Sequence, residues 1–290
     1  MSSRPGSRRT RRALSVSVLA SVLGTGLAVP LALAGPAAAA EPAATASVNE
    51  YGWHLTYTAA AGQANKVAIE QSYNDDRSQF TFVIDDSVPV ETGDGCEHPD
   101  ASDKTRISCT VEAPESQSPL ESLEMDLGDG DDSATFDNAT DQVYYFNTVR
   151  LGDGKDKWNS DHGGKDDGAS VHGGAGDDVL AIGAYGSAAG DDGDDTVSTT
   201  DGGEFLSGGA GDDVLRGGKG GQIMHADDGA DKLYGADGDD EMYGGKGNDL
   251  MYGNAGADRM WGNSGDDKLY GGAGRDTLSG GPGSNVVVQD

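Results

Sequence analysis

The chain has 290 residues, of which 47 are glycine, and its 50 acidic residues against 20 basic ones give a formal charge of −30. Aromatic residues make up only 6 %, which excludes a large aromatic-rich core of the ordinary globular type. The charge also argues against nucleic-acid binding, because phosphate recognition needs a basic surface. Charge and low hydrophobicity alone would favour disorder, but most of the glycines and carboxylates share one period.

The first forty residues have the layout of a secretory signal that is cleaved. An apolar stretch, Ala13–Ala34, leads to the alanine run Ala37–Ala40, and a basic head precedes it (Arg4, Arg8, Arg9, Arg11, Arg12). The stretch approaches membrane-spanning length, so a retained anchor is the alternative, but glycines and a proline interrupt it. Cleavage would change the formal charge from −30 to −35, since residues 1–40 carry five arginines and no acid. We expect an extracellular protein with no membrane span, exported by the general or the twin-arginine route.

Residues 41–126 predict a small all-β module. Runs of β-branched and alternating residues at 53–58, 66–69, 79–84 and 105–111 are separated by turn-forming residues, and a further strand is expected at 123–127. We therefore expect about five or six short strands here. A module of roughly 85 residues holds only a small core, so a covalent staple would help it.

The only two cysteines, Cys96 and Cys109, lie close together in this module. An even, small cysteine count in an exported chain favours a disulfide, which would contribute about 3 kcal/mol by closing a short loop. A metal or redox pair is the alternative, but the spacing matches neither CxxC nor a zinc pattern.

The rest of the chain follows a nine-residue period. Residues 127–290 hold 39 of the 47 glycines and 33 of the 50 acids. From Gly208 the register is unbroken to Val288, with glycine at position four, mostly aspartate at position six, and Leu, Met or Val at position eight. It extends upstream to 173, with a one-residue slip near Tyr185, and half-matches lie at 127–132 and 151–156. We divide this part into a degenerate repeat region, 127–172, and a regular one, 173–290.

The pattern G-G-x-G-x-D-x-U-x describes a coil of short strands and glycine-rich turns. Glycines bend the chain where φ is positive or backbones approach closely, and x-U-x makes a short strand with one inward side chain. Two units close a coil of eighteen residues, and stacked coils give two parallel sheets over a thin Leu/Met core. Stacked carboxylates in the turns would repel one another unless a cation lay between them, and such oxygen ligands suit Ca²⁺.

At these residues the sequence resembles the hemolysin-type (RTX) calcium-binding repeat family. The resemblance implies a right-handed parallel β-roll that binds several Ca²⁺ ions through position-six carboxylates and backbone carbonyls of the glycine-rich turns. The carboxylates so implied are Asp178, Asp195, Asp213, Asp231, Asp240, Asp249, Asp258, Asp267 and Asp276. With an eighteen-residue coil, Asp195, Asp213, Asp231, Asp249 and Asp267 should stack on one edge, and Asp240, Asp258 and Asp276 on the other. Residues 55–65, 93–96, Cys109 and 127–132 also resemble the region before the repeats in secreted actinobacterial calcium-binding proteins, a resemblance that implies no activity.

Several units depart from the family pattern. Gln222 replaces the aspartate between Glu204 and Asp240, so sites involving it should be weak or empty. Asn285 marks the terminal coil, where a half-site is expected. Asp132 and Asp156 belong to the degenerate units, and we leave them out of the predicted ligand set.

Two functions from different classes fit these features. The first is a calcium-binding structural protein that folds outside the cell. The second is a calcium-dependent adhesin that binds cell-surface polysaccharide through outward aromatic columns, Tyr234–Tyr252–Tyr270 and Tyr243–Trp261. Stacked rings that stabilise the sheets are the simpler explanation of these columns, because repeat duplication itself stacks identical residues. The five histidines are interpreted as surface or turn residues.

We find no HExxH, G-x-S-x-G or Walker motif, so we do not expect an enzyme, and an accessory domain of a hydrolase is the weakest alternative.

Overall fold

The computed structural model describes residues 43–113, 120–140, 145–160, 168–202 and 204–289. The predicted secretory signal, residues 1–40, lies outside these ranges. The described residues form strands and turns, and no helix among them is long and apolar enough to span a bilayer. The N-terminal strands are β1 (Ala44–Val48), β2 (Leu55–Thr58), β3 (Lys66–Tyr73), β4 (Gln79–Asp85), β5 (Val90–Thr92), β6 (Cys96–Glu97), β7 (Arg106–Glu112) and β8 (Leu120–Asp126).

The remaining strands of the described residues follow one another along the roll. They are β9 (Ser133–Asn138), β10 (Tyr145–Asp153), β11 (Lys157–Asn159), β12 (Ala169–Ala175), β13 (Val179–Ile182), β14 (Ser187–Asp192), β15 (Thr196–Thr199), β16 (Phe205–Ala210), β17 (Val214–Arg216), β18 (Ile223–Asp228), β19 (Lys232–Asp237), β20 (Glu241–Lys246), β21 (Leu250–Ala255), β22 (Arg259–Ser264), β23 (Lys268–Ala273), β24 (Thr277–Ser279) and β25 (Val286–Val288). The all-β fold class predicted from the sequence is confirmed.

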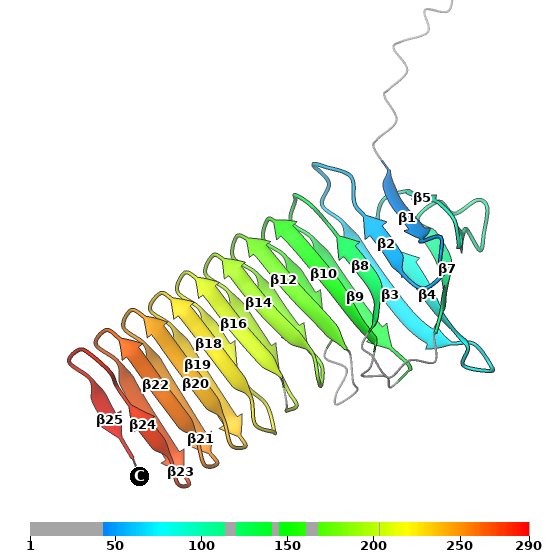
Figure 1. Ribbon diagram of the computed structural model, residues 1–290. Coiled ribbons are helices and arrows are strands. Elements are labelled where there is room, and N and C mark those ends of the chain that lie inside the picture. The colour runs from blue at the N-terminus through cyan, green and yellow to red at the C-terminus, as the bar shows by residue number, and fades with distance from the viewer. Residues whose placement is uncertain (1–42, 114–119, 141–144, 161–167, 203, 290) are drawn as a thin grey trace, which may run out of the picture. The chain divides into compact units, whose positions relative to one another are not determined.

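The strands form two sheets, and from β8 onward successive strands belong alternately to one sheet and to the other (Figure 1). One sheet has the order β24-β22-β20-β18-β16-β14-β12-β10-β8-β2-β1-β5, and the other has the order β25-β23-β21-β19-β17-β15-β13-β11-β9-β3-β4-β7-β6. From β8 and β9 onward every pairing is parallel, because the chain crosses from one sheet to the other in each turn. This is the parallel β-roll that the nine-residue period predicts.

The pairing register explains both the regular and the degenerate repeats. In the C-terminal coils each residue pairs with the residue eighteen positions away, as Leu233 does with Met251. Equivalent turn residues are 17 positions apart between Asp178 and Asp195, which accounts for the slip near Tyr185. The separation is 22 between Asp156 and Asp178, and 24 between Asp132 and Asp156. The degenerate region is therefore part of the same roll, with longer coils.

Apolar side chains from both sheets fill the roll. The position-eight residues of the regular coils from 206 to 269 are fully buried (Leu206, Leu215, Met224, Leu233, Met242, Met251, Met260, Leu269), and Leu278 is partly buried. The last member, Val287, is 47 % exposed, because no described residue packs beyond the final coil. Each coil thus buries apolar surface mainly against its two neighbours, as in other repeat proteins.

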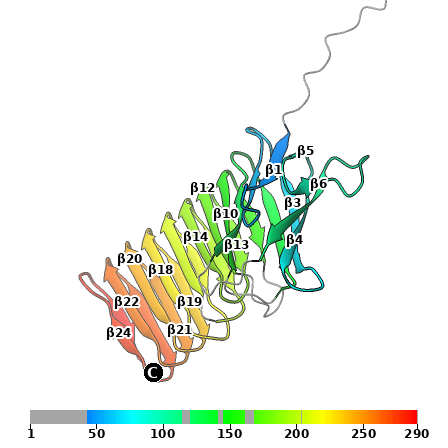
Figure 2. The same cartoon turned by 45° about the vertical axis from the view of Figure 1, so that its right-hand side comes forward.

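The N-terminal strands add antiparallel pairs to the beginning of both sheets (Figure 2). Strand β3 pairs in parallel with β9 on one side and antiparallel with β4 on the other, and β7 and β6 continue that sheet. Among the described residues eight strands lie before residue 127, and three of them, β1, β5 and β6, lie outside the runs from which strands were predicted; β5 and β6 are too short for a sequence pattern to reveal. Residues 41–290 form one compact unit, and a domain boundary near residue 126 remains a prediction.

A larger core and a disulfide stabilise this part. Its buried side chains include Tyr57, Phe80 and Phe82, which are bulkier than any in the regular coils. The disulfide joins Cys96 on β6 to Cys109 on β7, which are direct partners in the antiparallel register. The predicted disulfide is therefore confirmed.

Candidate metal centre

Most turns of the regular coils have the same backbone geometry, which the glycines make possible. In these turns position two has a positive φ even where it is not glycine, for example 76° at Ala236, and position four does so as well; the turn with Gly218 and Gly220 is an exception. A Cβ atom at Gly247, in position four, would lie 1.6 Å from the carbonyl oxygen of Gly229 in the preceding coil. Glycine therefore lets successive turns stack at their carbonyls, a close approach that any side chain would prevent.

The predicted aspartates form two hydrogen-bonded ladders, one along each edge of the roll. In each ladder, the backbone N–H of one position-six residue donates to the Oδ1 atom of the equivalent aspartate in the next coil, at 2.7 to 3.1 Å. The first ladder contains Asp178, Asp195, Asp213, Asp231, Asp249 and Asp267, and the second contains Asp240, Asp258 and Asp276. The edges predicted from the eighteen-residue coil are those observed; the role of these residues as calcium ligands remains a prediction.

The second carboxylate oxygen of every one of these aspartates is buried without a hydrogen-bond partner. The side chains are between 0 and 6 % exposed, and all nine Oδ2 atoms lack a donor. In the regular coils Oδ2 lies over the position-one glycine, where a Cβ at Gly208 would be 2.3 Å from Oδ2 of Asp213. An unpartnered buried acceptor costs about 1 to 3 kcal/mol, and more when it is charged. A column of such oxygens is a donor set that fits a hard cation such as Ca²⁺.

Burial also changes the proton affinity of these carboxyls. Loss of solvent raises the pKa of Asp178, Asp213, Asp231 and Asp240 from 3.8 to about 7, although the backbone N–H donors lower it in part. The same cause raises the pKa of Asp195 and Asp249 to about 6. Neighbouring carboxylates add to the effect, as Asp258 does for Asp240. Without a cation the ladders therefore favour protonated, neutral side chains.

Acid is accordingly expected to stabilise the calcium-free roll. An unfolded aspartate has a pKa near 3.8, whereas the folded values are about 6 to 7, so the folded state binds more protons between about pH 4 and pH 7. The stabilisation is complete below about pH 4 and is lost as pH rises through about 7. In chelator, the thermal midpoint Tm should be higher at pH 5 than at pH 8. A Tm that rises with pH in chelator would contradict this expectation.

The second ladder is interrupted where the sequence departs from the repeat. Gln222 keeps the ladder's backbone bond, since its N–H donates to Oδ1 of Asp240 at 2.8 Å. Its side-chain Nε2 donates to the carbonyl oxygen of Asp201 at 2.6 Å. This backbone oxygen therefore already has a hydrogen-bond donor, the neutral amide of Gln222. Glu204 is 2 % exposed and accepts a bond from the N–H of Tyr185. A weak or empty site at Gln222 remains the expectation.

The first ladder extends beyond the predicted ligand set. The N–H of Asp156 donates to Oδ1 of Asp178 at 2.8 Å, and the N–H of Asp132 donates to Oδ1 of Asp156 at 2.7 Å. The sequence analysis found both half-matches through the short pattern G-D-G-x-D, but it left their aspartates out of the predicted ligand set because the units are degenerate. The structure places both residues in the first ladder, in coils longer than eighteen residues.

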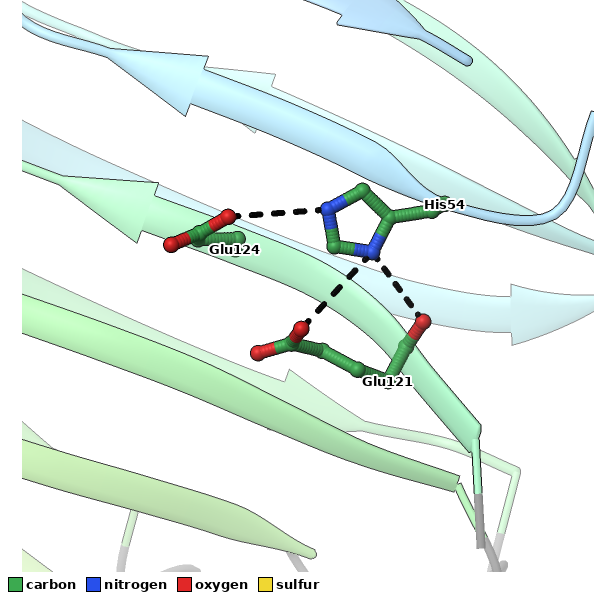
Figure 3. Close-up of side chains that lie close together, drawn as sticks. All are labelled: His54, Glu121 and Glu124. Atoms are coloured by element: carbon green, nitrogen blue, oxygen red, sulfur yellow. Dashed lines mark hydrogen bonds and ion pairs between the residues drawn. The ribbon is translucent and has the colours of Figure 1, made fainter. Parts of the chain in front are cut away.

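Sequence reasoning also missed a cluster of His54, Glu121 and Glu124, which Figure 3 shows. His54 precedes β2 and both glutamates lie on the neighbouring strand β8, so they are far apart in sequence. The Nδ1 atom of His54 is 3.2 Å from the carbonyl oxygen of Glu121, and Nε2 is 3.7 Å from Glu124. Glu124 also accepts a bond from Arg150 at 2.7 Å. Because these groups already have protein partners, the cluster is better explained as a polar contact between strands.

Comparison with known families agrees with this geometry. Residues 189–221, 216–251 and 252–287 match the RTX calcium-binding nonapeptide repeat. Residues 189–287 are therefore a run of RTX repeats, and repeats of this family bind calcium. No curated protein matches the chain.

Proposed function

We propose that the protein is an exported calcium-binding structural protein, in which Ca²⁺ ions occupy the turns of the β-roll. The observation that carries the proposal is the column of buried carboxylate oxygens without partners inside RTX repeats. Asp213, Asp231 and Asp249 in the first ladder, and Asp240 and Asp258 in the second, are central ligands, together with carbonyl oxygens of their turns. Ca²⁺ supplies the positive charge that lets these carboxylates stay ionised while buried.

Export is supported by the composition of the N-terminus. A basic head, an apolar stretch and an alanine run precede the described residues. Calcium-binding modules that work outside cells have dissociation constants of roughly 10⁻⁴ to 10⁻³ M. The formal charge of −30 would keep the calcium-free chain expanded until it reaches such a medium. We assign no catalytic role.

The aromatic columns fit a structural role better than a polysaccharide-binding one. The rings of Tyr234, Tyr252 and Tyr270 are stacked, with centroids 5.6 and 5.0 Å apart and interplanar angles of 6° and 12°. Tyr243 and Trp261 stack at 4.7 Å and 9°. The faces of these rings are thus used against each other, whereas a sugar ring needs an open aromatic face. The columns are explained as cross-strand pairs that stabilise the two sheets.

The proposal is tested by counting bound calcium ions in equilibrium dialysis, with Mg²⁺ as the competing ion. A variant with Asp240→Asn, Asp258→Asn and Asp276→Asn should bind at least two ions fewer than the parent protein. The matched control replaces three exposed position-five aspartates (Asp212→Asn, Asp239→Asn, Asp266→Asn), which makes the same charge change outside the ladders. The control should bind as many ions as the parent. A parent protein that binds no calcium at millimolar concentration would refute the proposal.

A further inference from the structure

The turn geometry of the RTX repeats continues into residues that the family match does not include. At position two, φ is 85° at Gly128 and 110° at Gly152, against 115° at Gly209 in a regular coil. At position four, φ is 136° at Gly130, against 137° at Gly211. The turns also stack in the same way, since a Cβ at Gly154 would lie 1.7 Å from the carbonyl oxygen of Gly130. Residues 127–132 therefore repeat the turn of the regular coils at both positions, and residues 151–156 share its position-two φ and its stacking, although φ at Gly154 lies outside the positive range.

A segment of the N-terminal module forms one more turn in this stack. The carbonyl oxygen of Gln63 would lie 2.3 Å from a Cβ at Gly130, which is the position-four contact of the regular coils. The N–H of Asn65 donates to Oδ1 of Asp132 at 2.5 Å, which is the ladder's own hydrogen bond across 67 residues. The first ladder thus begins at Asn65, well before any repeat is recognisable in the sequence.

Three oxygens at this end of the ladder are buried without hydrogen-bond partners: Oδ2 of Asp156, Oδ2 of Asp132 and Oδ1 of Asn65. The residues are only 1 to 2 % exposed. The orientation of the Asn65 amide is fixed, because its Nδ2 donates to the carboxylate of Asp86 at 2.7 Å and a carboxylate only accepts. The oxygen Oδ1 is therefore the atom left without a donor.

The opposite end of the ladder differs in this respect. Asn285 accepts the N–H of Asp267 through Oδ1, and its Nδ2 donates to the carbonyl oxygen of Gly281 at 2.9 Å. Both the oxygen and the nitrogen of the Asn285 amide have hydrogen-bond partners, so the ladder ends there without an unpartnered amide atom. At Asn65 the amide oxygen is still available, and two unpartnered carboxylate oxygens follow it in the next two coils.

We propose that the calcium ladder starts in the N-terminal module, with additional Ca²⁺ ions bound at Asp156 and at Asp132, and with the turn at residues 62–65 completing the Asp132 site. The inference rests on the proposed function, because it assigns the same ion to further turns of the same kind. Asn65 contributes a neutral oxygen ligand, which calcium accepts. Bound at Asp132, the ion ties the turn that precedes β3 to the turn that precedes β9.

A tryptophan next to the proposed sites allows a local test. Trp158 on β11 follows Asp156 by two residues and is 2 % exposed. With Trp53→Phe and Trp261→Phe as the background, its fluorescence reports on these coils alone. Asp132→Asn should bind one ion fewer than the background protein and should shift the Trp158 transition to at least threefold higher calcium. Asp131→Asn, an exposed neighbour with the same charge change, should leave both unchanged.

The comparison with the regular repeats separates this inference from the proposed function. Asp258→Asn should lose an ion but leave the Trp158 transition in place. If the parent binds calcium and Asp132→Asn binds the same number of ions with an unshifted Trp158 transition, this inference alone is wrong. If the parent binds none, the proposed function fails with it.

Hydrogen exchange of the unmodified protein gives a second measurement that does not depend on a variant's folding. Peptides covering residues 60–66 and 127–158 should exchange at least tenfold more slowly in calcium than in chelator, as peptides from 235–285 should. Slowing that is confined to 235–285 would overturn the inference.

Discussion

Removal of calcium is expected to unfold the regular coils of the roll. In chelator at pH 8, the far-ultraviolet circular dichroism of the purified protein should lose most of its β-signal. The reason is that each coil contributes only one or two apolar side chains to the core, such as Met251, while it buries a carboxylate on each edge where the ladder is complete. Saturation at about 100 times the dissociation constant stabilises the folded state by about 2.7 kcal/mol per site, and stacked sites add together. The coils should therefore form cooperatively.

A calcium titration from 10 µM to 10 mM would measure this transition, with Mg²⁺ at the same concentrations as the control. We expect a steep return of β-signal with calcium and little with Mg²⁺, which demands six ligands in a tighter geometry. Part of the signal should persist in chelator, since the strands around Phe80 and Phe82 have their own core and the Cys96–Cys109 disulfide. A spectrum that is the same in calcium and in chelator would contradict the expectation.

The substitution Gly256→Val is expected to prevent the coils around it from stacking. Gly256 has a φ of 153°, and an added Cβ would lie 1.7 Å from the carbonyl oxygen of Gly238. A β-branched side chain is strongly disfavoured at such a φ, and the carbonyl is backbone that a neighbouring coil holds in place. We expect a loss of at least about 4 kcal/mol of stability, the range reserved for severe steric or backbone effects.

Thermal unfolding in 10 mM calcium would measure the effect, and Ala255→Ser is the matched control. Ala255 is the preceding residue, is exposed and has no positive φ. Its variant should keep the Tm and the β-signal of the parent. Because coils interact mainly with their neighbours, Gly256→Val should reduce the β-signal in proportion to the C-terminal coils and leave the coils near Trp158 intact. A variant with the Tm of the parent would show that the turns adjust, contrary to our expectation.

The period of the sequence predicts the regular part of the structure almost completely. Strand position, inward side chain, eighteen-residue pairing and the two carboxylate edges all follow from the spacing of residues such as Gly247, Asp249 and Met251. The reason is that in a solenoid each repeat meets only its neighbours, so a local pattern fixes the nonlocal contacts as well. Even the one-residue slip near Tyr185 appears in the register of β13 and β15.

The remaining features depend on contacts that no period encodes. The bond from Asn65 to Asp132 and the cluster of His54 with Glu121 each bring together residues 67 positions apart. The short strands β5 and β6 are recognised by their pairing with β1 and β7. Where the spacing between turns widens to 22 and 24 residues, the period disappears from the sequence although the turns persist.

The two ends of the roll also differ, and the difference gives its assembly a direction. At one end, antiparallel strands, bulky aromatic side chains and a disulfide cover the sheets; at the other, β25 carries a half-exposed Val287. A stack whose members interact only with their neighbours grows from a seed, and the covered end provides a preformed one. Each new coil can then pair with a coil that is already folded on its N-terminal side. The roll should lengthen from the N-terminal part outward.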